Sequence, residues 1–87
     1  MIVLFNNGFE KALLKLPLKI RIAFKERLSI FMIDPYNEIL HNHRLKGPWR
    51  NYRSINITGD YRLIFEDFSD NTARLIDIGT HSELYGK

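Results

Sequence analysis

The chain has 87 residues, with 13 Lys and Arg against 10 Asp and Glu, a formal net charge of +3 and no cysteine. Its 45% apolar and 26% charged residues are typical of a globular protein rather than a disordered one. A chain of this length has a thin core and no room for a second domain, so we expect one domain over residues 1–87. Without cysteine, disulfides, thiolate zinc sites and a cysteine nucleophile are excluded.

Membrane and secretory signals are not found in the sequence. No apolar run approaches the roughly 18 residues that a membrane span needs. The segment Met1–Asn6 lacks the basic residues and the cleavage site of a signal peptide. We therefore expect a protein of the reducing cytoplasm, and its modest positive charge favours an anionic partner.

The first half of the sequence predicts one strand and two helices. The apolar run Ile2–Phe5 predicts the strand, and Asn7–Glu10 resembles the capping box that begins a helix. Pro17 interrupts that helix and can serve as the first residue of the next one. The second helix is expected over Leu18–Ile33, where apolar residues recur at helical spacing, and Asp34-Pro35 ends it.

The second half predicts a loop and three strands. Residues 36–48 have the composition of a loop, with one helical turn at Glu38–Leu40. The expected strands are Tyr52–Ile57, Tyr61–Phe65 and Ala73–Ile78, with turns at Gly59-Asp60 and Asp70-Asn71. Such short turns imply antiparallel neighbours. The expected fold class is therefore α+β: an N-terminal strand, an α-helical hairpin and an antiparallel three-strand meander, which form a twisted four-strand sheet with the helices packed on one face.

Basic and aromatic side chains alternate between Glu38 and Asp60, an interval that contains no acidic residue. The interval holds His41, His43, Arg44, Lys46, Arg50 and Arg53, with Trp49 and Tyr52 among them. Cations neutralise phosphates and aromatic rings stack on bases, so this composition favours binding of a single-stranded nucleic acid. The alternative is a solvated loop in which Trp49 and Tyr52 pack into the core.

The segment after the last expected strand places a histidine in a defined position. Thr80 and Glu83 form a second capping box, which puts His81 in the first turn of a short helix. An imidazole held there can exchange protons near neutral pH, although a surface histidine in a helix cap is the alternative. His41, His43, His81 and Asp60 could also supply nitrogen and oxygen ligands, but two histidines at i, i+2 are a weak signal and we expect no metal.

Two stretches carry a family pattern. From His43 to Phe65 the chain follows H-x-L-x-G-x-W-x-x-Y-R and then D-aromatic-x-L-I-aromatic, and from Gly79 to Tyr85 it follows G-[TS]-H-x-x-L-aromatic. Together these stretches resemble the RelE/ParE superfamily of toxin–antitoxin toxins, and within it the YafQ-like branch. The first 35 residues agree with the superfamily only in layout.

The resemblance implies a function, its partners and its chemistry. It implies a ribosome-dependent endoribonuclease, an mRNA interferase that enters the ribosomal A site and is kept inactive by a cognate acidic antitoxin. In such enzymes a ribose 2′-hydroxyl attacks the adjacent phosphate, so no metal or other cofactor is expected. The expected partners are the ribosome, mRNA and the antitoxin, with no membrane and with oligomers only through the antitoxin complex.

The resemblance also implies roles for individual residues. The expected catalytic set is His43, Asp60, His81 and Tyr85. His81 is expected to be the general acid, with Asp60 and His43 as proton acceptors or orienting groups. The expected nucleic-acid contacts are Lys46, Trp49, Arg50, Arg53 and Tyr61.

One position departs from the branch, which usually has histidine in a strand pattern R-x-x-H where this chain has Asn56. An amide forms hydrogen bonds but exchanges no proton at neutral pH. Slower cleavage, a transfer of the role to His43 and loss of activity therefore all stay open. Two other functions also stay open: a non-enzymatic ParE-like inhibitor of DNA gyrase, and an inactive member that only binds RNA or an antitoxin. The joint presence of the four expected catalytic residues favours the nuclease.

Overall fold

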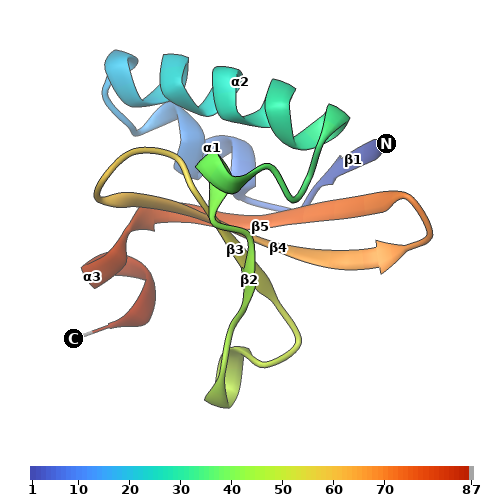
Figure 1. Ribbon diagram of the computed structural model, residues 1–87. Coiled ribbons are helices and arrows are strands. Elements are labelled where there is room, and N and C mark those ends of the chain that lie inside the picture. Colours follow the sequence, from blue (N-terminus) through green and yellow to red (C-terminus); the bar gives the residue numbers. More distant parts are fainter. Residues whose placement is uncertain (87) are drawn as a thin grey trace.

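The structure is a computed structural model that describes residues 1–86 (Figure 1). In chain order the elements are β1 (Ile2–Phe5), α1 (Phe9–Leu14), α2 (Leu18–Ile33), the 3-10 turn η1 (Glu38–Leu40), β2 (His43–Arg44), the 3-10 turn η2 (Gly47–Trp49), β3 (Arg53–Asn56), β4 (Tyr61–Ser69), β5 (Thr72–Thr80) and α3 (His81–Tyr85). None of the helices within this described range is both long enough and apolar enough to cross a lipid bilayer.

The five strands form one sheet in the order β1-β5-β4-β3-β2. β1 runs parallel to β5, whereas each of the other neighbouring pairs is antiparallel. The short turns after β3 and β4 permit only antiparallel neighbours, as in any meander. β1 can lie parallel to β5 because α1 and α2 carry the chain across the sheet before the meander begins.

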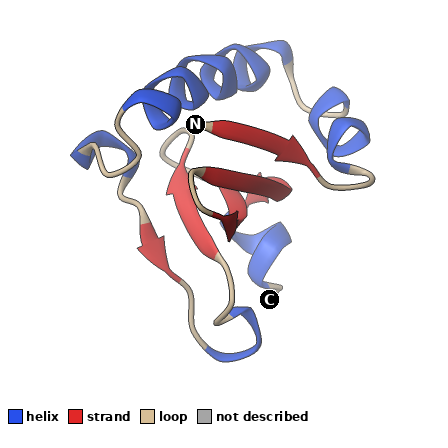
Figure 2. Cartoon of the chain, turned by 90° about the vertical axis from the view of Figure 1, so that its right-hand side faces the viewer, coloured by secondary structure: helices blue, strands red, loops and turns tan. Residues whose placement is uncertain are grey.

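Helices α1 and α2 cover one face of the sheet, and the apolar core lies between them and the strands (Figure 1). Aromatic rings fill this layer: Phe9 lies 5.8 Å from Phe24, and Phe31 meets Phe65 edge to face at 4.8 Å between ring centroids. Figure 2 shows α2 above the strands and α3 on their other side. The second face of the sheet therefore stays open near the C-terminus, where α3 and the β2–η2 segment border it.

The predicted α+β class is confirmed, as are the second helix over Leu18–Ile33 and the helical turn at Glu38–Leu40. The sheet has five strands rather than four, because His43 and Arg44 pair with Ser54 and Arg53 as β2 inside the segment that was predicted to be a loop. A strand of two residues shows no alternation of apolar and polar side chains, so only pairing with β3 defines it. That residues 1–87 form one domain stays a prediction.

The capping box predicted at Asn7–Glu10 is wrong. Gly8 occupies the N-cap of α1 with φ 85°, and no side chain in the described part of the chain caps the helix. Asn7 therefore lies one position too early for its side chain to reach the first-turn amides. The strand ends also differ from the prediction, because β4 continues to Ser69 and β5 begins at Thr72. These extensions form an exposed hairpin, and its mostly polar residues do not show the apolar pattern that predicts a strand.

Candidate functional site

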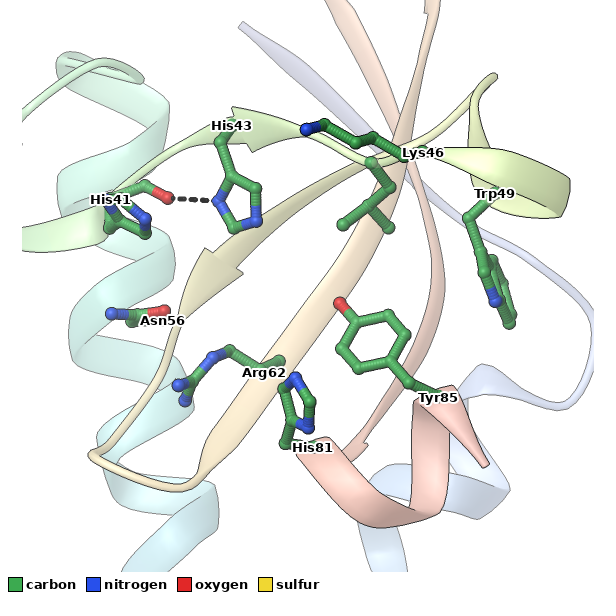
Figure 3. A pocket seen from close by; sticks show the side chains of 9 residues that line it. His41, His43, Lys46, Trp49, Asn56, Arg62, His81 and Tyr85 are labelled. Atoms are coloured by element: carbon green, nitrogen blue, oxygen red, sulfur yellow. Dashed lines mark hydrogen bonds between the residues drawn. The ribbon is translucent and has the colours of Figure 1, made fainter. Parts of the chain in front are cut away.

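A pocket of about 420 Å³ lies between the β2–η2 segment, the ends of β3 and β4, and α3. Its lining consists of His41, His43, Leu45, Lys46, Trp49, Asn56, Arg62, His81 and Tyr85. Figure 3 shows these side chains converging from the three borders of the pocket. Six of them belong to the predicted site: His43, Lys46, Trp49, Asn56, His81 and Tyr85.

Strand alternation decides which residues of β3 and β4 reach the pocket. Asn56 pairs directly with Arg62 across the two strands, and both side chains line the pocket. Their neighbours Ile55 and Leu63 form the adjacent pair and are fully buried in the core on the helix-covered face. Since successive side chains point to opposite faces, the pocket lies on the face away from α1 and α2.

Arg62 is a site residue that the sequence analysis missed. Its Nη1 donates to the carbonyls of Thr58, Gly59 and Tyr61 at 3.1–3.3 Å, so the guanidinium is held by the turn between β3 and β4. The other guanidinium nitrogens remain available as donors to an anion in the pocket. Alternation within β4 could have found this residue, since apolar Leu63 and Phe65 lie on one face of the strand and Arg62 therefore lies on the other.

His43 and His41 form the border of the pocket at β2. The two rings lie 4.7 Å apart between centroids, and Nδ1 of His43 lies 2.9 Å from the carbonyl oxygen of His41. His41 is the C-cap of η1 and has left-handed backbone angles, φ 50° and ψ 51°. His41 was expected as one of the basic residues of the interval and as a weak metal candidate but not in the catalytic set, yet its ring lines the same pocket.

Helix α3 holds His81 and Tyr85 on the opposite border. The predicted capping box is confirmed: Thr80 Oγ1 accepts from the Glu83 amide, and Glu83 Oε1 accepts from the Thr80 amide. The His81 amide donates to the carbonyl of Asp60 at 3.1 Å, which joins α3 to the β3–β4 turn. Residues four apart share a helix face, so the His81 and Tyr85 rings meet at 4.7 Å.

Because Gly79 has no side chain, α3 can pack closely against the end of β5. A Cβ atom there would lie 3.0 Å from Glu83 Oε1, the oxygen that completes the capping box, and 3.5 Å from Leu84. On the far side of the pocket, Trp49 approaches Tyr85 edge to face at 6.3 Å and Tyr52 at 5.8 Å. The rings of Trp49 and Tyr85 therefore line the pocket together, with Tyr85 next to His81.

Two of the expected nucleic-acid contacts lie on the helix-covered face. Arg53 Nε donates to Asn42 Oδ1 at 2.8 Å, and its guanidinium lies 5.5 Å from the ring of Tyr36. Tyr61 packs against the apolar core. Arg53 is three residues from Asn56 and Tyr61 is one residue from Arg62, so alternation turns both away from the pocket. Neither residue therefore lines this pocket, and the nucleic-acid contacts expected for them stay a prediction.

Arg50 and Asp60 lie near the site without lining it. Arg50 is exposed at the end of η2 and donates to the carbonyl of Gly47 at 3.4 Å. Asp60 is exposed in the β3–β4 turn, and the bond that its backbone carbonyl accepts is its connection to His81. The catalytic role expected for the Asp60 carboxylate stays a prediction.

The charges of the lining match an anion. Lys46 and Arg62 are cations, and no carboxylate is among the nine lining residues, all of which the structure describes. Within residues 1–86, no three His, Asp or Glu side chains come together as a group that could hold a metal ion. The pocket thus offers imidazoles for proton transfer, cations for a phosphate and rings for stacking.

The fold and the sequence both match known proteins. Residues 6–86 match the family model described as the bacterial toxin of a type II toxin–antitoxin system, YafQ. The mRNA interferase toxin YafQ of Escherichia coli strain K12 is 33% identical over 52 residues, which cover 60% of this chain and 55% of that protein. The match thus spans about half the length of that curated relative.

Solved structures share the fold along nearly the whole chain. The crystal structure of YafQ from Escherichia coli strain BL21(DE3) is 24% identical with a TM-score of 0.78, and 97% of each chain is covered. The toxin in the Escherichia coli DinJ-YafQ toxin–antitoxin complex is 24% identical with a TM-score of 0.75, over 97% of this chain and 96% of that one. A chain of the RelB-RelE antitoxin–toxin complex from Methanococcus jannaschii is 25% identical with a TM-score of 0.74, over 95% of each chain.

Proposed function

The chain belongs to the YafQ family of bacterial toxins of type II toxin–antitoxin systems, and from this membership we propose that it is an endoribonuclease that cleaves mRNA. One observation carries the proposal: His43 and His81, from segments far apart in the sequence, line the same pocket as Lys46 and Arg62. A module that only bound protein would need no such convergence of imidazoles and cations, which favours the nuclease over a ParE-like gyrase inhibitor.

The reaction is an internal attack on the RNA backbone. The ribose 2′-oxygen forms a bond to the adjacent phosphorus while the bond from phosphorus to the 5′-oxygen breaks, which leaves a 2′,3′-cyclic phosphate and a free 5′-hydroxyl. A base accepts the 2′-hydroxyl proton, an acid donates a proton to the leaving 5′-oxygen, and cations stabilise the negative phosphorane. The chain's own side chains can supply each of these parts.

We assign the parts by position in the pocket. His81, on α3, is the general acid, and His43, on the opposite border, is the proton acceptor. Lys46 and Arg62 contact the phosphate oxygens, and Tyr85 with Trp49 holds a base by stacking. Asp60, through its carbonyl, keeps the backbone of His81 in place.

The ribosome is the proposed setting of the reaction, as the resemblance to the YafQ-like branch implies. The pocket is open to solvent beside exposed Lys46 and Arg50, so a strand and the surrounding ribosomal RNA can both approach the same face. Because translated mRNA is the substrate, we propose that the protein acts in the cytoplasm.

The proposed partner that inhibits the toxin is an acidic antitoxin, for which α1 and α2 offer a surface. Leu14, Leu18 and Ile22 are 69%, 63% and 51% exposed and border an apolar groove with Arg21 and Lys25. Residues 9–33 carry Lys11, Lys15, Lys19, Arg21, Lys25 and Arg27 against Glu10 and Glu26, a net charge of +4. An amphipathic segment with acidic flanks that folds on binding would match this surface.

The antitoxin surface can be tested by co-purification with the acidic protein encoded beside the toxin gene. Ile22→Asp should weaken the complex at least tenfold, because it places a charge in the apolar contact. Ser69→Asp, at the exposed end of β4 on the far hairpin, is the matched control and should leave the complex intact. Equal binding by both variants would exclude this surface.

The nuclease assignment can be tested with His81→Ala. A reporter mRNA is translated with purified ribosomes, and new 5′ ends are mapped, while sedimentation measures ribosome association. Loss of a general acid should lower cleavage by roughly 100-fold or more with association unchanged. Ser82→Ala, at the next position of α3 and also exposed, is the control and should cut normally. Full cleavage by His81→Ala would remove His81 from the mechanism.

A further inference from the structure

The hydrogen bond between His43 and His41 fixes where one proton lies. A backbone carbonyl only accepts hydrogen bonds, so the 2.9 Å contact between Nδ1 of His43 and the carbonyl of His41 requires a proton on Nδ1. A neutral imidazole carries one N–H, and the second nitrogen is then an acceptor. In neutral His43 that acceptor is Nε2, and Figure 3 shows this nitrogen directed into the pocket.

The backbone of His41 creates this contact. Its angles, φ 50° and ψ 51°, lie in the left-handed region, which only a few per cent of non-glycine residues adopt, histidine, asparagine and aspartate more often than the others and β-branched residues least. The conformation ends η1 and turns the His41 carbonyl toward the first residue of β2. The His41 ring also packs 4.7 Å from the His43 ring, which restricts rotation of His43 about its side-chain bonds.

We propose that His41 is a positioning residue for His43: its left-handed backbone holds the proton on Nδ1 and so presents Nε2 of His43 to the pocket as the proton acceptor. The proposal rests on the proposed ribonuclease function and assigns the acid and the base within it. Asn56, the neighbouring polar group on this border, exchanges no proton, so a fixed His43 tautomer supplies the acceptor that the amide lacks.

The arrangement separates the two histidines by role. His43 is held with its bare nitrogen toward the pocket, whereas within residues 1–86 no side chain forms a hydrogen bond with the ring nitrogens of His81, whose ring meets that of Tyr85 edge to face. A hydrogen-bond acceptor on the second nitrogen of a catalytic imidazole orients the ring. Replacing such an acceptor lowers the catalytic rate by orders of magnitude. The His41 carbonyl would have that part here.

The tautomer can be measured directly on the free protein. Long-range proton–nitrogen NMR spectra of the wild-type chain, recorded where His43 is neutral, should show a protonated Nδ1 and a bare Nε2. A protonated Nε2 with a bare Nδ1 would overturn the proposal. Because this measurement needs neither RNA nor ribosomes, it separates the proposal from the proposed function: the expected tautomer in a protein that cuts no RNA would remove the function alone.

Two variants separate the carbonyl of His41 from its ring. His41→Asn and His41→Val both remove the imidazole, but asparagine tolerates left-handed angles and a β-branched valine does not. We expect His41→Asn to keep the Nδ1-protonated tautomer of His43 and to cut reporter mRNA at least about tenfold faster than His41→Val. Equal cleavage and equal tautomers in the two variants would show that the carbonyl has no such role. If His41→Val does not fold, the tautomer in His41→Asn decides: a switch to protonated Nε2 there refutes the proposal.

Discussion

The capping box of α3 gives a quantitative link between one hydroxyl group and the candidate site. α3 has five residues, and Leu84 is the one it buries, so this helix has little stability of its own. Thr80 Oγ1 accepts the hydrogen bond from the Glu83 amide at 3.2 Å, and the Glu83 carboxylate returns a bond of 2.8 Å. Thr80→Ala removes the first bond and leaves the carboxylate less ordered.

Loss of such a cap costs about 1 kcal/mol, with a range of roughly 0.5–2. One kcal/mol corresponds to about a fivefold change in the ratio of formed to unwound α3. The Gly86 amide reports on that ratio, because its 2.9 Å bond to the Ser82 carbonyl breaks only when α3 unwinds. In Thr80→Ala we expect this amide to exchange with solvent about fivefold faster, while amides of β4 and β5 keep their rates.

Cleavage should fall in parallel, because α3 holds both His81 and Tyr85 at the pocket. The assay combines hydrogen exchange with mapping of cleaved reporter mRNA, and Thr80→Ser is the control because serine retains the hydroxyl oxygen. Equal exchange at Gly86 in Thr80→Ala and Thr80→Ser would show that the Thr80 hydroxyl does not stabilise α3. Faster exchange with unchanged cleavage would show that an ordered α3 is not needed for the reaction.

Three further predictions concern the core and the two faces of the sheet. Phe31→Ala should lower the free energy of unfolding by about 3–5 kcal/mol in urea titrations, because the ring is 1% exposed and packs edge to face on Phe65; a loss below about 1 kcal/mol would contradict the assigned core. Arg53→Ala should lower the free energy of unfolding by about 1 kcal/mol, because the hydrogen bond to Asn42 is lost. The variant should still cut reporter mRNA at the wild-type rate per folded molecule, and a tenfold loss of rate would show that Arg53 takes part in the reaction. Asn56→His should raise the rate of cleavage, because an imidazole at this position can exchange a proton. Asn56 Oδ1 is buried without a hydrogen-bond partner among residues 1–86, so the change breaks no bond of that oxygen. An unchanged rate would show that His43 alone suffices as the proton acceptor.

Much of the fold was predictable because its signals are local. The helix over Leu18–Ile33, the turn at Glu38–Leu40 and the cap at Thr80 each depend on residues within about one helical turn of one another. The error at Asn7 is also local, because the predicted N-cap is wrong by one residue. The N-cap is Gly8, which has a left-handed backbone and no side chain to cap the helix. β2 left no local signal, since two residues become a strand only through their partners in β3.

The candidate site was predictable in part. The family pattern named His43 and His81, and the structure brings them to one pocket. Arg53 and Tyr61 do not line the pocket, because neither the composition of the basic interval nor the family pattern distinguishes the two faces of a strand. The alternation of side chains along β4 can be read from the sequence, and it predicts Arg62 rather than Tyr61 on the pocket face.

Short spacings along the chain therefore specify the helices, four of the strands, the basic interval, the capped C-terminal helix and the family. Which side chains share the pocket depends on cross-strand register and on the packing of α3 against β5, so it became visible in the folded chain alone. The same holds for the proton on His43: it follows from the left-handed backbone at His41 and from the direction of the His41 carbonyl, and no local pattern in the sequence predicts either one.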